Sequence, residues 1–115
     1  MTHWIAVDFD GVLVEQYGFR RDGAIGAPVM PMIERVRGWL AEGRDVRIFT
    51  TRVWPLGTTT TDTDCKASVQ LSAIMDWCIR YLGRTIPVTC IKEPWVGAIY
   101  DDKAYRVGMN SGKLL

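Results

Sequence analysis

Two aspartates follow an apolar run near the start of the chain. Trp4, Ile5, Ala6 and Val7 lead directly into Asp8-Phe9-Asp10-Gly11. Side chains alternate along a strand, so Asp8 and Asp10 point to the same side where the run ends. Two carboxylates that close repel each other, and a cation between them relieves the repulsion. Mg²⁺ typically binds one or two carboxylates together with phosphate oxygens of a substrate, so the pattern predicts phosphate chemistry at a magnesium site.

Three other polar positions follow apolar runs in the same way. They are Thr50, Lys92 and the pair Asp101-Asp102. Each has an ordinary interpretation alone, because threonines suit strand ends, lysines suit surfaces and aspartates cap helices. The Asp8–Gly11 segment alone is likewise compatible with a simple turn. If the runs are parallel strands, however, their carboxyl ends meet in one crevice, and the set then forms one site.

The chemistry of these residue types suggests a role for each. Asp8 is the candidate nucleophile, because a carboxylate that attacks phosphorus splits one difficult displacement into two easier ones. Asp10 can protonate the leaving oxygen and later accept a proton from water. The metal ion would lie between Asp8, the Asp10 backbone carbonyl, one acid of Asp101-Asp102 and a phosphate oxygen. Thr50 and Lys92 would stabilise the phosphoryl oxygens through a hydroxyl and a fixed positive charge.

Strand and helix patterns alternate along the chain. We expect strands at residues 4–9, 45–50, 88–91 and 98–100, and helices from Pro31 to Gly43 and up to Gly83. The second helix has this predicted apolar face: Val69, Leu71, Ile74, Met75, Cys78, Ile79 and Leu82. The order predicts an α/β fold, with a Rossmann-like, mostly parallel sheet and helices on both faces. A length of 115 residues fits a single domain, residues 1–115.

Segments between these elements raise separate expectations. Glycine-rich residues 12–29 predict a flap or small hairpin, and residues 53–64 predict a loop insertion. About six residues separate the last two apolar runs, whereas a parallel crossover usually needs a dozen. Either the two runs are not both strands, or their connection is unusually tight. A helical turn is expected near Lys103, followed by a polar tail from Gly108 that frays.

Composition excludes several classes of protein. The net charge of +1 gives no reason to expect a nucleic-acid partner, although a local basic patch would be compatible with one. No apolar run approaches the roughly 20 residues that span a bilayer, and no signal-peptide pattern precedes Trp4, so we expect a cytoplasmic protein without membrane contact. A single histidine, His3, makes a zinc site or a serine triad improbable. Three widely spaced cysteines, Cys65, Cys78 and Cys90, predict reduced thiols.

The assembled residues resemble the haloacid dehalogenase-like (HAD) hydrolase superfamily. Its four motifs are matched in order by residues 8–12, residues 46–50, Lys92 and residues 100–102, across nearly the whole chain. The resemblance implies a Rossmann-like sheet, obligatory Mg²⁺ and an aspartyl-phosphate on Asp8. It also implies a phosphatase rather than a dehalogenase, because members that cleave carbon–halogen bonds lack the second aspartate, here Asp10.

The same resemblance suggests finer assignments. By similarity to family members that have two adjacent acids, we expect Asp102 to bind the metal directly. Asp101 would then lie behind Asp102, without direct contact to the metal. Thr51 and Arg52 follow the motif threonine as a small residue and an arginine often do, so both are candidates for substrate contact. No full cap domain fits in residues 12–29 or 53–64. The open site therefore favours a large substrate, or an oligomeric partner that covers it.

Rival functions remain at this point. A nucleotide or polynucleotide end phosphatase would line its entry with Arg20, Arg21 and Arg52. A phospho-acceptor signalling module gathers similar groups around Mg²⁺, but there the acidic pair precedes the acceptor in the chain. A non-catalytic phosphate-binding protein is the third rival, and the presence of all four motif residues argues against it. The substrate itself is not indicated by the sequence.

Overall fold

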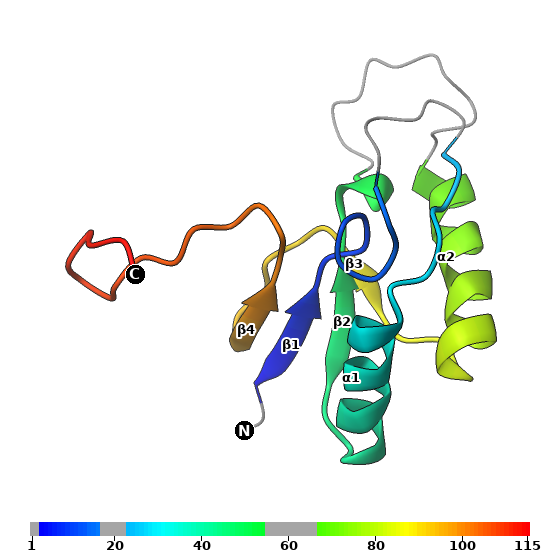
Figure 1. Ribbon diagram of the computed structural model, residues 1–115, viewed down its shortest axis with the longest axis horizontal. Helices are drawn as coiled ribbons and strands as arrows, with labels where there is room; N and C mark the ends of the chain where they lie inside the picture. The colour runs from blue at the N-terminus through cyan, green and yellow to red at the C-terminus, as the bar shows by residue number, and fades with distance from the viewer. Residues whose placement is uncertain (1–2, 17–22, 55–66) are drawn as a thin grey trace.

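A four-stranded parallel sheet forms the centre of the molecule (Figure 1). The computed structural model describes residues 3–16, 23–54 and 67–115. The strands are β1 (Trp4–Val7), β2 (Val46–Phe49), β3 (Val88–Thr89) and β4 (Val96–Tyr100), in the spatial order β3-β2-β1-β4. All three pairings are parallel. The predicted α/β class with a Rossmann-like parallel sheet is confirmed.

Two α-helices connect the first three strands. They are α1 (Met30–Ala41) and α2 (Ala67–Leu82), and a short 3₁₀ helix, η1 (Thr51–Val53), follows β2. Proline in the first turn of α1 suits a helix start, where the missing N–H has no partner to lose. Gly43 and Gly83 have φ angles of 79° and 78°, a left-handed conformation that commonly ends helices. Both predicted helices are therefore confirmed, with their predicted stops.

Both α-helices pack against the same face of the sheet. Ile5 and Val7 of β1 belong to one buried cluster that includes Ile33 of α1 and Ile74 of α2, and the two helices contact each other. The chain steps from β1 to β2 to β3 in one direction, and right-handed crossovers then place successive helices on one side. The expectation of helices on both faces is corrected in this respect, for the described residues.

The second face is crossed by the connection from β3 to β4. Residues 90–95 pass from one edge of the sheet to the other without a helix (Figure 1). The open question about the short connection is thereby answered: both runs are parallel strands and the link is tight. Trp95, its last residue, has a φ angle of 72°, a left-handed conformation that is costly for a bulky side chain.

Trp4 and Arg47 fasten this connection to the sheet. The indole Nε1 of Trp4 donates to the Pro94 carbonyl at 3.1 Å, and the Arg47 guanidinium lies 4.6 Å from the centre of the Trp4 ring. Arg47 also donates to the Glu93 carboxylate at 2.8 Å and to both oxygens of Asp45. An ion-paired arginine stacked on an aromatic ring thus covers the face that has no helix.

The buried face of α2 differs from the predicted one. Ile74, Cys78 and Trp77 are buried as core residues, and Gln70 is buried beside them. Four residues assigned to the apolar face are exposed instead: Val69, Leu71, Met75 and Ile79. The predicted face combined residues of two neighbouring stripes: Ile74 and Cys78 are buried as predicted, but Trp77, which was not predicted, shares the core with them. The Trp77 ring packs edge-on against the Phe9 ring, with their centroids 5.1 Å apart.

The flap predicted at residues 12–29 has two antiparallel arms where it is described. Glu15 N–H donates to the Ala27 carbonyl and Val29 N–H to the Leu13 carbonyl, both at 2.8 Å. Its centre, residues 17–22, and most of the predicted 53–64 insertion lie outside the described residues.

The C-terminal segment contradicts two expectations. No helical turn forms at Lys103, because its N–H is taken by the Asp101 carboxylate in a local turn. The tail also has defined pairing rather than frayed ends, since Val107 bridges Leu114 and Leu115 N–H donates to the Arg106 carbonyl. Within the described part of the chain, no helix has both the length and the apolar character to cross a membrane.

Paired substitutions on α2 test which stripe supports the core. We expect Ile74→Ala to lower the free energy of unfolding by about 2–5 kcal/mol, because it opens a cavity among fully buried side chains. Ile79→Ala on the same helix is the matched control, and as an exposed site it should change stability by about 0.5 kcal/mol or less. Urea denaturation measures both, and equal losses would contradict the packing described.

Candidate functional site

Strand pairing brings the first and last acidic motifs together. In the β1–β4 register Val7 lies opposite Tyr100, so the residues that follow, Asp8 and Asp101, lie beside each other. The Asp8 N–H donates to the Tyr100 carbonyl at 2.9 Å and extends the pairing to the strand ends. Because the strands are parallel, both aspartates leave the sheet at the same edge.

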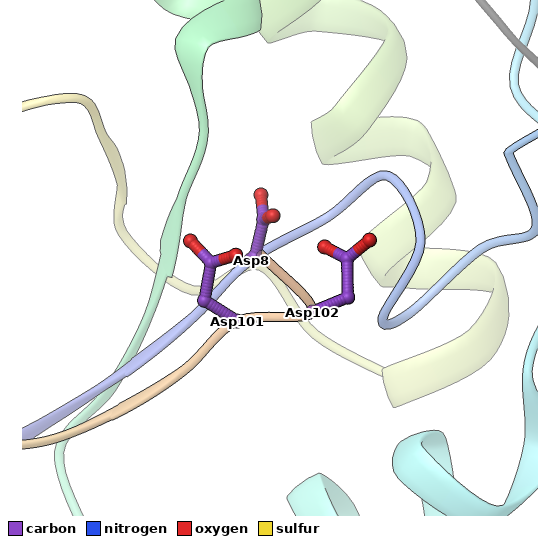
Figure 2. Close-up of side chains that lie close together, drawn as sticks. All are labelled: Asp8, Asp101 and Asp102. Carbon is purple, nitrogen blue, oxygen red and sulfur yellow. The ribbon is translucent and has the colours of Figure 1, made fainter. Parts of the chain in front are cut away.

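Three carboxylates converge at this edge. One oxygen from each of Asp8, Asp101 and Asp102 lies within 4.8 Å of the other two. Figure 2 shows the three side chains directed to the same side of the strand ends. Ligands on opposite sides of a Mg²⁺ ion at its usual bond length are about 4.2 Å apart, so small inward movements would suffice to bind one. A set of three hard oxygen donors fits Mg²⁺ better than softer metals.

The electrostatics of Asp8 agree with this geometry. Burial raises the pKa of Asp8 from 3.8 to about 6, a hydrogen bond from the Phe9 N–H opposes the rise, and the negative charges of Asp101, Asp102 and Asp10 add to it. Within the described residues, no lysine or arginine forms an ion pair with Asp8, Asp101 or Asp102. A divalent cation would supply the missing positive charge.

A tight turn after Asp8 lies against the Asp102 carboxylate. Gly11 has a φ angle of 84°, and a Cβ atom there would lie 2.6 Å from the Asp102 carboxylate. Glycine is therefore required twice, for the backbone conformation and for the close approach of Asp102. The Phe9 carbonyl accepts from the N–H groups of Leu13 and Val14, which holds the turn closed.

The two adjacent acids have different surroundings. One oxygen of Asp101 accepts the Lys103 N–H at 2.8 Å, which fixes that side chain in a turn. Asp102 is exposed, and its carboxylate lies against Gly11. This difference favours Asp102 as the acid with more freedom to bind a metal, in agreement with the assignment suggested by the resemblance.

The Asp10 side chain points into a different environment from Asp8. Arg52 holds it with two hydrogen bonds, from Nε to one oxygen at 2.7 Å and from Nη2 to the other at 2.8 Å. Both side chains are largely covered, at 20% and 15% exposure. A paired fork of this kind is a strong and directional contact. Asp10 is thus beside the carboxylate cluster, but its side chain is not one of the three converging groups.

Thr50 lies at the end of β2, where it was predicted. Its side chain is buried, and its hydroxyl oxygen accepts the Arg52 N–H at 3.2 Å, which caps η1. The hydroxyl hydrogen has no acceptor among the described residues, so it is free to donate to a ligand. Thr51 is exposed as the first residue of η1.

Gln70 is a residue of the candidate site that the sequence motifs did not indicate. It is 4% exposed, and its side-chain oxygen accepts from Arg52 Nη1 at 2.8 Å. The available signal was its place on α2, since Gln70 shares a helical face with Ile74 and Trp77 at spacings of four and seven residues. A polar residue on the buried stripe of an amphipathic helix indicates a hydrogen-bonding partner in the interior.

The remaining predicted site residues are not joined to the cluster by any described contact. Lys92 is exposed three residues beyond β3, and no hydrogen bond or ion pair links it to another described residue. Arg20 and Arg21 lie outside the described residues.

A cavity of about 330 Å³ lies at the amino ends of β1 and β4, at the opposite end of these strands from the three carboxylates. His3, Trp4, Arg44 and Gly97 are among the residues that line it.

Comparisons with known proteins support the fold alone. No family model and no curated protein matches the chain. A solved structure described as a conserved protein coded by a locus from Bacteroides thetaiotaomicron superimposes with a TM-score of 0.57. The match has 19% sequence identity and covers 90% of this chain and 78% of that one. At that identity, the likeness establishes a shared α/β architecture.

Metal binding can be tested through stability. We expect Mg²⁺ at ten times its dissociation constant to raise the free energy of unfolding of the wild type by about 1.4 kcal/mol. Asp8→Asn and Asp102→Asn should lose most of this gain, and Asp101→Asn should lose less because one of its oxygens is already bonded within the chain. Thermal unfolding with and without Mg²⁺ measures the effect. Equal gains in all variants would contradict a metal site here.

The pH dependence without metal has a defined sign. Because the folded-state pKa of Asp8 is raised to about 6 from 3.8, ionised Asp8 destabilises the folded chain above pH 6, and the penalty disappears as pH falls through that interval. Asp8→Asn cannot ionise. We therefore expect the variant to be more stable than the metal-free wild type at pH 8, and this advantage to shrink by pH 4. A constant difference across this range would exclude the raised pKa.

Proposed function

We propose that this protein is a Mg²⁺-dependent phosphatase that hydrolyses a phosphate monoester through an aspartyl-phosphate on Asp8, in the manner of HAD-like hydrolases. The observation that carries the proposal is the convergence of Asp8, Asp101 and Asp102 within 4.8 Å at neighbouring strand ends. The buried Thr50 directly follows β2, the strand beside β1, and Asp10 lies two residues beyond Asp8. Asp8, Asp102 and the Asp10 backbone carbonyl would hold Mg²⁺, which would neutralise charge between the nucleophile and an anionic substrate.

In the first half-reaction, an oxygen of Asp8 forms a bond to phosphorus while the bond from phosphorus to the leaving oxygen breaks. Asp10 donates a proton to that oxygen, so the alcohol leaves in neutral form. The Thr50 hydroxyl donates a hydrogen bond to a phosphoryl oxygen, where charge gathers as the bonds exchange. The product on the protein is an acyl phosphate on Asp8.

In the second half-reaction, water forms a bond to phosphorus and the bond from phosphorus to Asp8 breaks. Asp10, now ionised, accepts the proton of the attacking water. Inorganic phosphate leaves, and Asp8 and Asp10 return to their starting states.

Two further expectations stay predictions. They are the participation of Lys92 in catalysis and the cytoplasmic location of the protein.

A phosphatase assay with matched variants tests the proposal. We expect the wild type to hydrolyse p-nitrophenyl phosphate only with Mg²⁺, and Asp8→Asn to fall to background because no other group can form the covalent intermediate. Asp10→Asn should lower kcat for an alkyl phosphate, whose leaving oxygen needs a proton, by about 10²–10⁴, the usual share of general acid–base catalysis. Asp76→Asn, an exposed carboxylate on α2, is the control and should retain full activity.

Acid quenching during turnover should trap a phosphate on Asp8 that hydroxylamine releases. Undiminished hydrolysis by Asp8→Asn would contradict the covalent mechanism. A stable phosphoprotein without turnover would instead favour the phospho-acceptor module.

A further inference from the structure

The Arg52 guanidinium is fully occupied by protein acceptors. Nε and Nη2 donate to the two Asp10 oxygens, and Nη2 also donates to the Ala24 carbonyl at 3.0 Å. Nη1 donates to the Gly23 carbonyl at 2.7 Å and to the Gln70 side chain at 2.8 Å. An arginine side chain has five N–H hydrogens, and these five hydrogen bonds use all of them.

This occupancy bears on the predicted role of Arg52 in substrate binding. A phosphate could be bound by Arg52 only if one of the five acceptors were given up. Two of those acceptors belong to a charged pair that is mostly shielded from water, and separation of such a pair is costly. The geometry therefore points to contacts within the protein rather than to a phosphate clamp.

The acceptors of Arg52 come from three separate segments. Asp10 belongs to the turn after β1, Gly23 and Ala24 belong to the second arm of the flap, and Gln70 belongs to α2. Arg52 itself lies in η1, directly after the predicted catalytic threonine. One side chain thus joins the acid/base candidate to the flap that extends from the site.

We propose that Arg52 is a positioning residue, which fixes the Asp10 carboxylate against the described second arm of the flap, residues 23–29, so that Asp10 is held aligned for proton transfer. Its catalytic consequence rests on the proposed phosphatase function. Each carboxylate oxygen can accept a second hydrogen bond, so the pairing with Arg52 leaves Asp10 able to exchange a proton with a leaving group or water. Arg52 acts on the reaction through Asp10 and not through the substrate.

Arg47 provides a matched control in the same chain. It too forms a two-pronged pair with an aspartate, Asp45, and a further bond to Glu93, and its side chain is 23% exposed. Arg47 lies on the helix-free face and contacts neither Asp10 nor the flap. Arg47→Lys therefore removes a comparable arginine fork without touching the proposed coupling.

Steady-state kinetics with two leaving groups test the role in catalysis. Lysine keeps the charge at position 52 but cannot reproduce the fork. We expect Arg52→Lys to lower kcat by about 10²-fold for an alkyl phosphate, whose leaving oxygen needs a proton, and by about tenfold or less for p-nitrophenyl phosphate, whose leaving group does not. KM should stay within about twofold for both. Arg47→Lys should match the wild type.

A double-mutant cycle separates positioning from substrate binding. If Arg52 acts through Asp10, the Arg52→Lys/Asp10→Asn double variant should be no slower than Asp10→Asn alone. Multiplicative losses would overturn the proposal, as would a rise in KM with unchanged kcat, which is the signature of a substrate clamp. An Arg52→Lys variant faster than the wild type would also overturn it, because Arg52 would then restrain Asp10.

Hydrogen exchange tests the coupling to the flap without any activity. The amides of Glu15 and Val29 close the described arms of the flap, and both should exchange at least about tenfold faster in Arg52→Lys. The amide of Ile5 in β1 should not change, which would show that the fold persists. Gln70→Leu removes one acceptor and should have a smaller effect in the same direction, which keeps the test valid if Arg52→Lys does not fold.

The two proposals fail in different ways. A wild type without Mg²⁺-dependent hydrolysis would remove the proposed function, while faster exchange of Glu15 and Val29 would still support the Arg52 coupling. Unchanged exchange of these amides in both variants would overturn the coupling even if the phosphatase is active.

Discussion

The pairing of β1 with β4 forces like charges together. Their register places Asp8 beside Asp101, and a backbone hydrogen bond from Asp8 to Tyr100 holds the two strand ends in contact. Asp102 approaches from the same side, against a glycine that leaves room for it. The backbone pairing that stabilises the sheet is therefore the same pairing that concentrates three carboxylates. A bound divalent cation would relieve the repulsion and make the arrangement useful.

The distribution of positive charge supports the same interpretation. Arg52, which follows Thr50 by two residues, is paired with Asp10 rather than with any of the three converging carboxylates. Asp8 is consequently left with neighbours of its own sign, and its pKa is raised toward neutrality by burial and by these charges. Under the proposed function, a bound metal ion would offset the negative charge around Asp8 and orient its carboxylate, whereas Arg52 would orient the carboxylate of Asp10.

Much of the fold could be predicted from the sequence because local signals agreed with one another. Pro31 and Gly43 placed the two ends of α1, Gly83 placed the carboxyl end of α2, and the apolar runs placed the strands. Predictions that depended on packing were less successful. On α2, the apolar residues Met75 and Ile79 recur at helical spacing just as Ile74 and Cys78 do. Only the shape of the core decides that Ile74 and Cys78 are buried while Met75 and Ile79 are exposed. The side on which a helix crosses the sheet likewise depends on strand order, which no single segment encodes.

The residues of the candidate site also fall into those that the sequence predicts and those that only packing determines. Asp8, Asp101 and Asp102 were predictable, because strand ends of a parallel sheet must meet at one edge. The partner of Arg52 was not, since a surface phosphate and a buried carboxylate are equally good acceptors for an arginine. Gln70 escaped notice because its only signal is a polar residue on a stripe that was not recognised as buried.

The most direct test of the central claim is a crystal structure grown with Mn²⁺ in place of Mg²⁺, with the ion located by its anomalous scattering. The account predicts one strong peak at about 2.2 Å from carboxylate oxygens of Asp8 and of Asp102 or Asp101. A structure in which Mn²⁺ binds elsewhere, while these three carboxylates stay without an ion at saturating metal, would contradict it.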